Sequence, residues 1–362
     1  MEHESPKVST LLSRYYKREK MTLNCQVITP MFLGNADQQA EWRTAPFKAM
    51  LRYWWRVTQG NIDTNELRKR EGELFGSVGT GGIDTASKSL VNVVIAGQEV
   101  LPSRNNLKKD LKLRHPEVSF GDGTVPALLY LAGMGLMKPN GQVNHSYFPA
   151  DGKFHISLRL PKDKENVLNS VIALIQAFGA IGARCRNGWG SFQLPDPYLD
   201  SLQAEALLQK ITVDWKTAVQ GIDYPHCLGK DEKGLLLWKT KESRNSWEET
   251  MKDLAEAYIV IRTSLGVNGD DRPAERHLLG FPITHHEAKK SKGWGKEARH
   301  GSPLRFVVRR RTNGFMGFML HLPFAFSEQM QFPKNIVPVK VWQKVHLELD
   351  KTLTRARYED CL

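Results

Sequence analysis

A glycine-rich segment at residues 179–192 constrains the fold of this chain more than any other stretch. It directly follows a helical pattern and contains four glycines, Gly179, Gly182, Gly188 and Gly190. Glycine adopts positive φ at little steric cost, and a run of such residues can expose N–H groups as an anion-binding concavity. No Gly-Lys-Ser or Gly-Lys-Thr follows it, so the segment is not a nucleotide P-loop. It fits either a phosphate-binding loop or a plain turn between a helix and a strand.

Net charge points to a polyanionic partner. The 362 residues include 51 Lys and Arg against 39 Asp and Glu, a formal net charge of +12. Such an excess does not by itself separate RNA, DNA and a membrane surface. A basic segment at residues 281–311 holds nine Lys or Arg against two Glu, a net of +7. A second cluster at residues 104–114 adds +4 and is more typical of a solvated loop.

The cysteines and the N-terminus indicate a cytoplasmic protein without a bound metal or cofactor. Four cysteines lie far apart, none forms a Cys-x-x-Cys pair, and no Cys/His set has zinc-finger spacing. Unpaired cysteines suit a reducing compartment. Residues 1–20 form a polar leader without the apolar core of a signal peptide. No run of eighteen apolar residues predicts a membrane span.

The first half of the chain is predicted to alternate strands and helices in a ferredoxin-like order. Apolar alternation predicts strands at 21–29, 89–95, 154–160 and 191–194, and helical spacing predicts helices at 44–58 and 165–178. Thr44 is a candidate cap of the first helix, whose core face carries Phe47 and Trp54. Residues 96–150 form an insertion with a short helix near 126–137. Without this insertion the order is β-α-β-β-α-β, as in ferredoxin-like or RRM-type domains.

The second half is predicted to contain a degraded copy of the same unit. Residues 195–197 are a candidate boundary because they are rich in proline. Ser246 and Glu249 form a capping box that opens a helix to residue 264. Strands at 304–311 and 315–322 flank a Thr-Asn-Gly turn, and a helix follows at 339–353. We therefore expect an α+β fold with two ferredoxin-like domains, at residues 21–195 and 196–362.

Several segments resemble a known family. The stretches 29–37 (TPMFLGNAD), 43–56 (RTAPFKAMLRYWWR) and 74–77 (LFGS) resemble the start of the first-subunit family of type III-B CRISPR-Cas (Cmr) effector complexes. The glycine-rich loop is similar to the signature loop of the RAMP superfamily, to which that family belongs. Farther on, residues 277–282 (HLLGFP) and 299–304 (RHGSPL) resemble the family's second half.

This resemblance implies a fold, partners and a function. The family has two ferredoxin-like domains and is a non-catalytic RNA-binding subunit of a ribonucleoprotein for antiviral defence. The resemblance places such a subunit at the head of the complex, near the 3′ end of the guide RNA and beside another RAMP subunit. The expected partners are therefore guide RNA, complementary target RNA, or both, and other Cmr subunits.

Ten side chains are candidates for RNA contact. On the first helix Lys48, Arg52 and Arg56 recur every four residues beside Trp55, so basic groups and an aromatic ring share one stripe. The alternative is a solvated helix face with Trp55 buried. In the glycine-rich loop Arg184 and Arg186 can bind phosphate, and Trp189 can stack on a base. Weaker candidates are Arg299, Arg309 and Arg311; strand alternation should expose the last two on one face.

Two other functions compete with RNA binding. Some RAMP proteins cleave RNA, and Asp37 lies in the loop before the first helix, a position that resembles the one used by the cleaving subunit. A single carboxylate in a Gly-Asn-Ala-Asp turn also fits a structural role, so we favour a non-catalytic protein. The third possibility is a protein–protein scaffold without direct RNA contact.

Overall fold

The structure is a computed structural model, and it describes most of the chain. The described residues are 18–60, 62–78, 86–96, 100–108, 110–119, 121–195, 198–221, 227–267, 271–283, 288, 291–295, 297–327 and 329–362. The leader up to residue 17, part of the candidate boundary and four lysines of the basic clusters (Lys109, Lys289, Lys290 and Lys296) lie outside them. The described part is a mixed α+β fold with several antiparallel sheets.

The first half forms one four-stranded antiparallel sheet. Its strands are β1 (Arg18–Val27), β2 (Asn92–Ala96), β5 (Lys153–Pro161) and β6 (Phe192–Gln193), in the spatial order β2-β5-β1-β6. Helix α2 (Thr44–Thr58) follows β1, and helix α5 (Glu165–Phe178) follows β5. Both helices have the predicted bounds because apolar residues at helical spacing define them strongly. The cap of α2 is not Thr44 but Arg43, which makes no side-chain capping hydrogen bond.

The second half repeats this succession. Strands β10 (Leu237–Lys239), β11 (Leu304–Arg311), β12 (Gly314–His321) and β13 (Thr354–Arg355) form a sheet in the order β11-β12-β10-β13. Helix α8 (Trp247–Ser264) follows β10, and helix α9 (Pro338–Thr352) follows β12. The side chain of Ser246 accepts a hydrogen bond from the Glu249 N–H, as the capping signal predicts. In both sheets the first and third strands in chain order are central.

Several shorter elements were not expected from the sequence. They are helices α3 (Thr64–Phe75), α6 (Ser201–Ile211) and α7 (Trp215–Gly221), the hairpin of β3 (Lys112–Arg114) and β4 (Thr124–Pro126), and the small sheet of β7 (Thr212–Asp214), β8 (Leu228–Asp231) and β9 (Gly234–Leu235). Helix α4 (Ala127–Ala132) lies within residues 126–137, where a short helix was predicted. Helix α3 is mostly polar, so its start is marked by a cap: the Asp63 side chain accepts from the N–H groups of Asn65 and Glu66. Three single 3₁₀ segments complete the described structure: Lys162–Lys164, Glu275–Leu279 and Tyr358–Cys361.

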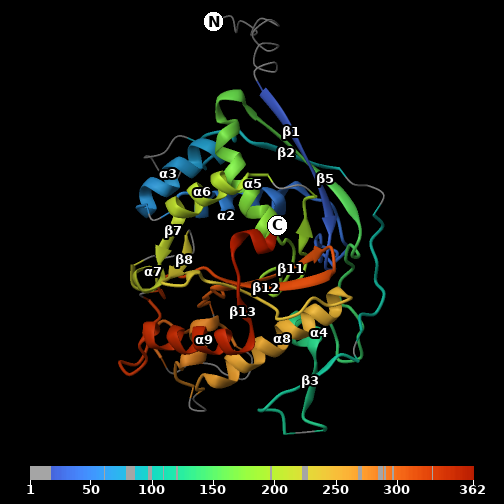
Figure 1. Cartoon of the computed structure of the whole chain (residues 1–362), viewed down its shortest axis with the longest axis vertical. Helices are drawn as coiled ribbons and strands as arrows, with labels where there is room; N and C mark the ends of the chain where they lie inside the picture. The colour runs from blue at the N-terminus through green and yellow to red at the C-terminus, as the bar shows by residue number, and fades with distance from the viewer. Residues whose placement is uncertain are drawn as a thin grey trace, which may run out of the picture.

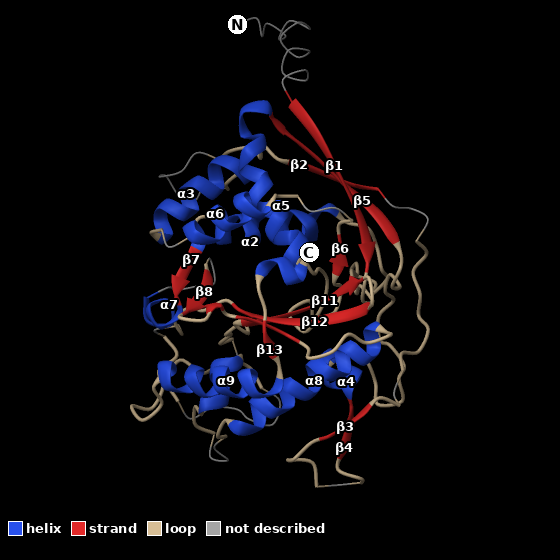
Figure 2. Cartoon of the chain, viewed as in Figure 1, coloured by secondary structure: helices blue, strands red, loops and turns tan. Residues whose placement is uncertain are grey.

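Apolar residues from the two halves pack together. One face of the second sheet, which carries Val307 and Phe318, belongs to the same apolar cluster as Phe178 of α5. The opposite face, with Phe306 and Met319, belongs to the cluster that includes α8 and α9. Figure 1 shows this sheet across the middle of the molecule, with α2 and α5 on one side and α8 and α9 on the other. The same alternation of helical and sheet layers is visible in Figure 2.

The insertion connects the two halves. Helix α4 packs on α8, and the Leu131 carbonyl accepts a hydrogen bond from Asn187 Nδ2 in the glycine-rich loop at 2.9 Å. The guanidinium of Arg276, which is 2% exposed, pairs with Glu117 of the insertion. These contacts join residues 100–150 to both the loop and the second half. None of the described helices is both long and apolar enough to cross a bilayer.

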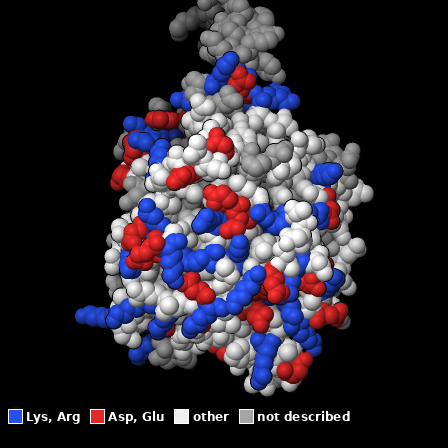
Figure 3. All heavy atoms as spheres, in the orientation of Figure 1, with Lys and Arg blue, Asp and Glu red and all other residues white. Residues whose placement is uncertain are grey.

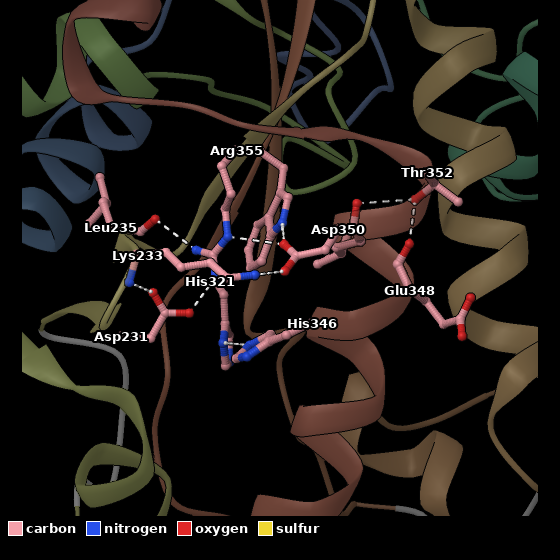
Figure 4. Close-up of polar contacts among 11 residues, drawn as sticks. Asp231, Lys233, Leu235, His321, His346, Glu348, Asp350, Thr352 and Arg355 are labelled. Carbon is pink, nitrogen blue, oxygen red and sulfur yellow. Dashed lines mark hydrogen bonds and ion pairs between the residues drawn. The ribbon is translucent and has the colours of Figure 1, made fainter.

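A buried polar cluster lies under the second sheet (Figure 4). His321 Nδ1 lies 3.0 Å from His346 Nε2. Nearby, Asp350 accepts hydrogen bonds from Trp238 Nε1 at 2.7 Å and from Lys233 Nζ at 2.8 Å, and it pairs with Arg355. Burial is the main cause that lowers the pKa of His346 to about 3, with the Arg355 charge adding to it. Burial, followed by the neighbouring ring of His346, also lowers the pKa of His321 well below its ordinary value.

We expect this histidine pair to make the protein acid-sensitive. In the unfolded chain both rings titrate near pH 6.5, so between that value and about pH 3 the unfolded chain binds more protons. Stability is therefore fully present above pH 6.5 and is lost as the pH falls, by about 2 kcal/mol at pH 5 for His346; His321 acts in the same direction. Chemical denaturation at several pH values should show a shallower loss in the His321→Leu/His346→Leu variant. The exposed His155→Leu serves as control, and an unchanged slope in the double variant would contradict the assignment.

Candidate nucleic-acid interface

A cleft of about 570 Å³ lies where the glycine-rich loop meets the first helix. Its walls come from the loop between β1 and α2, the outer face of α2, residues 180–186 and strand β11. The lining is mainly apolar, and no Asp or Glu is among its described residues. The apolar lining includes Phe32, Leu33, Pro46, Ala49, Met50, Tyr53, Leu136, Ile181 and Ala183, and the polar lining includes Asn35, Gln38, Arg43, His145, Arg186 and Arg305.

Three arginines line this cleft, and no carboxylate of the described residues pairs with them. Arg43 donates to the Gly34 carbonyl, and Arg186 Nη1 donates to the Ser302 carbonyl at 3.1 Å. Elsewhere in the described chain arginines such as Arg244, Arg310 and Arg355 form ion pairs with Asp side chains. The cleft therefore concentrates positive charge that the protein does not neutralise.

Arg305 is the most unusual of the three. It is the second residue of β11, and it is only 7% exposed. The guanidinium carbon lies 4.8 Å from the ring centroid of Tyr53 and 5.2 Å from that of Trp54. Its Nε has no hydrogen-bond partner among the residues that the structure describes. A buried cation without a partner is costly, and the aromatic faces offset only part of that cost.

The glycine-rich loop is packed against the rest of the protein and is not an open concavity. Gly182 has φ +99°, and a Cβ there would lie 2.7 Å from the Phe32 carbonyl oxygen. At Gly190, with φ +64°, a Cβ would lie 1.8 Å from the Ile181 oxygen. The N–H groups of Ile181, Ala183 and Asn187 already donate to protein carbonyls. All four glycines lie where a Cβ would come within 3.0 Å of another atom, so the loop is closely packed and offers ligands mainly its side chains.

The structure places the loop arginines differently from each other. Arg184 has a φ of +57° and is exposed, with its guanidinium near Gly133 of the insertion. Arg186 is half-buried and reaches into the cleft. Trp189 is fully buried: its ring packs edge-on against Phe32 at 5.5 Å and against Trp247 at 6.0 Å. The expectation that Trp189 stacks on a base is wrong in this structure, because the ring is part of the core.

Most side chains of the predicted RNA-contact stripe on α2 already contact other parts of the protein. Arg52 Nε lies 2.6 Å and Arg56 Nη1 2.9 Å from Oε1 of Glu71, a 7% exposed residue of α3. Lys48 stays half-buried on the helix surface, and burial together with Arg52 lowers its pKa. Trp55 is 3% exposed and packs against Phe75. Trp55 is therefore a core residue and not a stacking platform, and Glu71 already neutralises much of the charge of the two arginines.

The structure places the candidate RNA-contact residues of the basic segment in different environments. Arg309 is 1% exposed, and its guanidinium donates to the Gly179 carbonyl at 3.2 Å, so its expected exposure is wrong. Burial lowers the pKa of Arg309 to about 10. Alternation along β11 does put Arg309 and Arg311 on one face, but that face packs toward the first half. Arg299 is exposed, and Arg311 is half-buried. On the face shown in Figure 3, basic and acidic side chains are interspersed.

Asp37 lies outside the cleft lining. Its backbone N–H donates a hydrogen bond to Asn35 Oδ1 at 2.9 Å in an exposed turn. The same Asn35 oxygen also accepts from the Gln39 N–H. This is a local turn of the type that Asn and Asp commonly stabilise. Among the described residues, no group of three or more His, Cys, Asp or Glu side chains is placed to hold a metal ion.

Sequence reasoning did not single out three residues of the cleft: Arg43, Tyr53 and Arg305. For Arg305 a signal exists in the sequence, because it interrupts an otherwise apolar strand at Leu304–Val308. A charged residue inside a strand that is covered on both faces needs a specific reason. For Arg43 and Tyr53 the sequence carries no comparable signal, since both are ordinary at a helix start and on a helix flank.

Comparison with known proteins identifies the class of the first half. The family model of the RAMP superfamily matches residues 24–193. The matched part of the chain contains the glycine-rich loop and most of the first sheet, and it is similar to the RAMP superfamily. No curated protein matches the chain.

Solved structures give particular relatives of low identity. The chain is similar to apo Cmr1 from Pyrococcus furiosus, at 18% identity and a TM-score of 0.48, over 91% of this chain and 97% of that chain. It is similar to a chain of the type III-B Cmr-beta complex bound to cognate target RNA, at 11% identity and a TM-score of 0.44, over 91% of this chain and 99% of that chain. A chain of a type IV-B CRISPR complex matches at 15% identity and a TM-score of 0.30, over 52% and 99%.

Proposed function

We propose that this protein is a non-catalytic RNA-binding subunit of a type III-B CRISPR-Cas effector complex. The observation that carries the proposal is the buried, unpaired guanidinium of Arg305 in a cleft that contains Arg43 and Arg186 but no described carboxylate. The RAMP-superfamily match over the glycine-rich loop supports an RNA partner. The proposed partners are guide RNA, its complementary target, or both, together with other Cmr subunits.

The proposed mode of binding is independent of sequence. Arginine forks in the cleft hold phosphates, with Arg184 and Lys48 at its approaches. Sequence specificity then resides in pairing between guide and target, as in other RNA-guided systems. Arg299 and Arg311 remain proposed secondary contacts. The two sheets with the same strand succession support two ferredoxin-like domains, which we propose meet near residues 195–196.

Salt dependence of RNA affinity tests this proposal. If the three cleft arginines each neutralise a phosphate, log affinity for a single-stranded RNA should fall with log salt with a slope of about −2, since each contributes about −0.7. Fluorescence anisotropy with a labelled oligoribonucleotide across a salt series measures it. Absent binding, or affinity indifferent to salt, would instead favour a protein–protein scaffold.

An RNA cleavage assay tests the proposal that the protein is non-catalytic. Purified protein is incubated with a guide-complementary RNA and Mg²⁺, and the products are separated on a denaturing gel. We expect the RNA to stay intact with the wild type and with Asp37→Ala alike. Cleavage by the wild type that disappears in Asp37→Ala would show the endoribonuclease alternative to be correct.

A further inference from the structure

We propose that the cleft receives one unpaired RNA base, turned out of its strand, and that Arg305 binds the phosphate next to it. This inference rests on the proposed RNA-binding function and adds to it. A site that held only a phosphate backbone would need cations on a surface. This cleft instead places its cations at the edge of a deep, mainly apolar cavity.

The size and lining of the cavity suit a nucleobase. Its volume of about 570 Å³ lies within the range of small-molecule sites, about 300–1,000 Å³. Pro46, Ala49 and Met50 of α2 form one wall, and Ile181 and Ala183 of the loop form another. Apolar walls of this kind can contact the flat ring of a base, but they offer a phosphate neither a hydrogen-bond donor nor a positive charge.

Tyr53 and Arg305 form one end of the cavity. The tyrosine is half-buried and lines the cleft, and the guanidinium lies against its ring. A planar guanidinium and an aromatic ring are both surfaces on which unstacked RNA bases are commonly held. Because the remaining N–H groups of Arg305 make no hydrogen bond or ion pair with the described residues, they stay available to a phosphate oxygen.

Polar groups at the rim can contact the edge of such a base. Gln38 has φ +61° and lies in the loop that closes the cleft, and its side-chain amide makes no hydrogen bond within the described part of the chain. One ring nitrogen of His145 interacts with the Gly135 carbonyl at 3.2 Å, which leaves the other for a ligand. An amide and an imidazole accept or donate, so they tolerate more than one base.

The walls come from rigid elements, which limits the ligand to single-stranded RNA. Met50 and Ile181, which line the cavity, also belong to the apolar core. A paired base inside a duplex cannot leave its stack without breaking its pair. The geometry therefore selects a nucleotide that is already unpaired, such as one at a strand end or in a gap between paired segments.

An abasic oligonucleotide tests the base pocket. Two oligomers of equal length and phosphate number are compared by anisotropy, one of uridine and one of abasic ribose. Stacking of a base contributes about fivefold to over a hundredfold in affinity, so we expect the uridine oligomer to bind at least about fivefold more tightly. Equal affinities would overturn the base pocket while leaving RNA binding intact. No binding of either oligomer would overturn both this inference and the proposed function.

A pocket-filling variant provides an independent reading. Ala49 is exposed on α2 and lines the cleft, whereas Ala45 is exposed on the same helix outside it. Ala49→Phe should lower the affinity for the uridine oligomer to that for the abasic one, with no change for the abasic oligomer. The matched control Ala45→Phe should change neither. An Ala49→Phe protein with wild-type preference for uridine would refute the pocket.

Discussion

Replacing Arg305 with methionine is expected to lower the affinity for single-stranded RNA by about ten- to a hundredfold, the effect of losing one or two hydrogen bonds to a charged group, about 1.5–3 kcal/mol. Methionine retains most of the packing against Tyr53 and Trp54 but removes the charge. The lost cation–π contact and the relief of an unpaired buried cation oppose each other. We therefore expect the free energy of unfolding to change by less than about 1 kcal/mol.

Arg310, five positions further along β11, supplies a control for Arg305. Its guanidinium is 2.6 Å from Asp151. Arg310→Met should leave RNA affinity within about twofold, because Arg310 lies outside the cleft lining and already pairs with Asp151. Affinity is measured by anisotropy and unfolding by urea titration of the same samples. Wild-type RNA affinity in Arg305→Met would refute the assigned role of Arg305.

Substituting Gly190 with alanine is expected to destabilise the protein by about 4 kcal/mol or more, among the largest effects of a single substitution. The backbone there has φ +64°, which penalises any residue with a Cβ. The added carbon would lie 1.8 Å from the Ile181 oxygen. Relief would require separating two segments that are joined by the Ile181 N–H to Gly190 carbonyl hydrogen bond of 3.0 Å.

Gly135→Ala is the control for this substitution. A Cβ at Gly135 meets no atom within 4 Å, and its φ lies outside the left-handed region. Thermal unfolding of the two purified variants should therefore separate them, with Gly135→Ala close to the wild type. A Gly190→Ala protein that unfolds at the wild-type temperature would show that the loop tolerates a side chain and is less tightly packed than described here.

The order of the main elements could be predicted because their signals are local. The helices at Thr44–Thr58 and Glu165–Phe178 have strong apolar periodicity, and the hairpin of β11 and β12 surrounds an Asn-Gly turn. By contrast, α3 is mostly polar, and α6 has only 11 residues, so their N-terminal caps are their clearest local signals. The insertion could be located by composition, but its packing on α8 depends on contacts that no local pattern encodes.

The candidate site was predicted only in part. The glycine-rich loop lines part of the cleft, yet Trp55, Trp189 and Arg309 are buried, since an aromatic or arginine residue type does not reveal which face it occupies. Glu71 neutralises Arg52 and Arg56 from a helix that the sequence did not reveal. Arg305 and Arg43 come together across more than 250 positions of sequence, so their proximity is a property of the fold.

The apolar cluster shared by the two halves of the chain affects how a ligand can enter the cleft. Because Phe178 of the first half and Val307 of the second belong to one apolar cluster, the two halves cannot separate without exposing that cluster to water. For the RNA ligand proposed above, the strand would therefore enter a cleft whose shape is already set, and the flexible nucleotide would adapt to it. We expect its binding to proceed as a single kinetic phase.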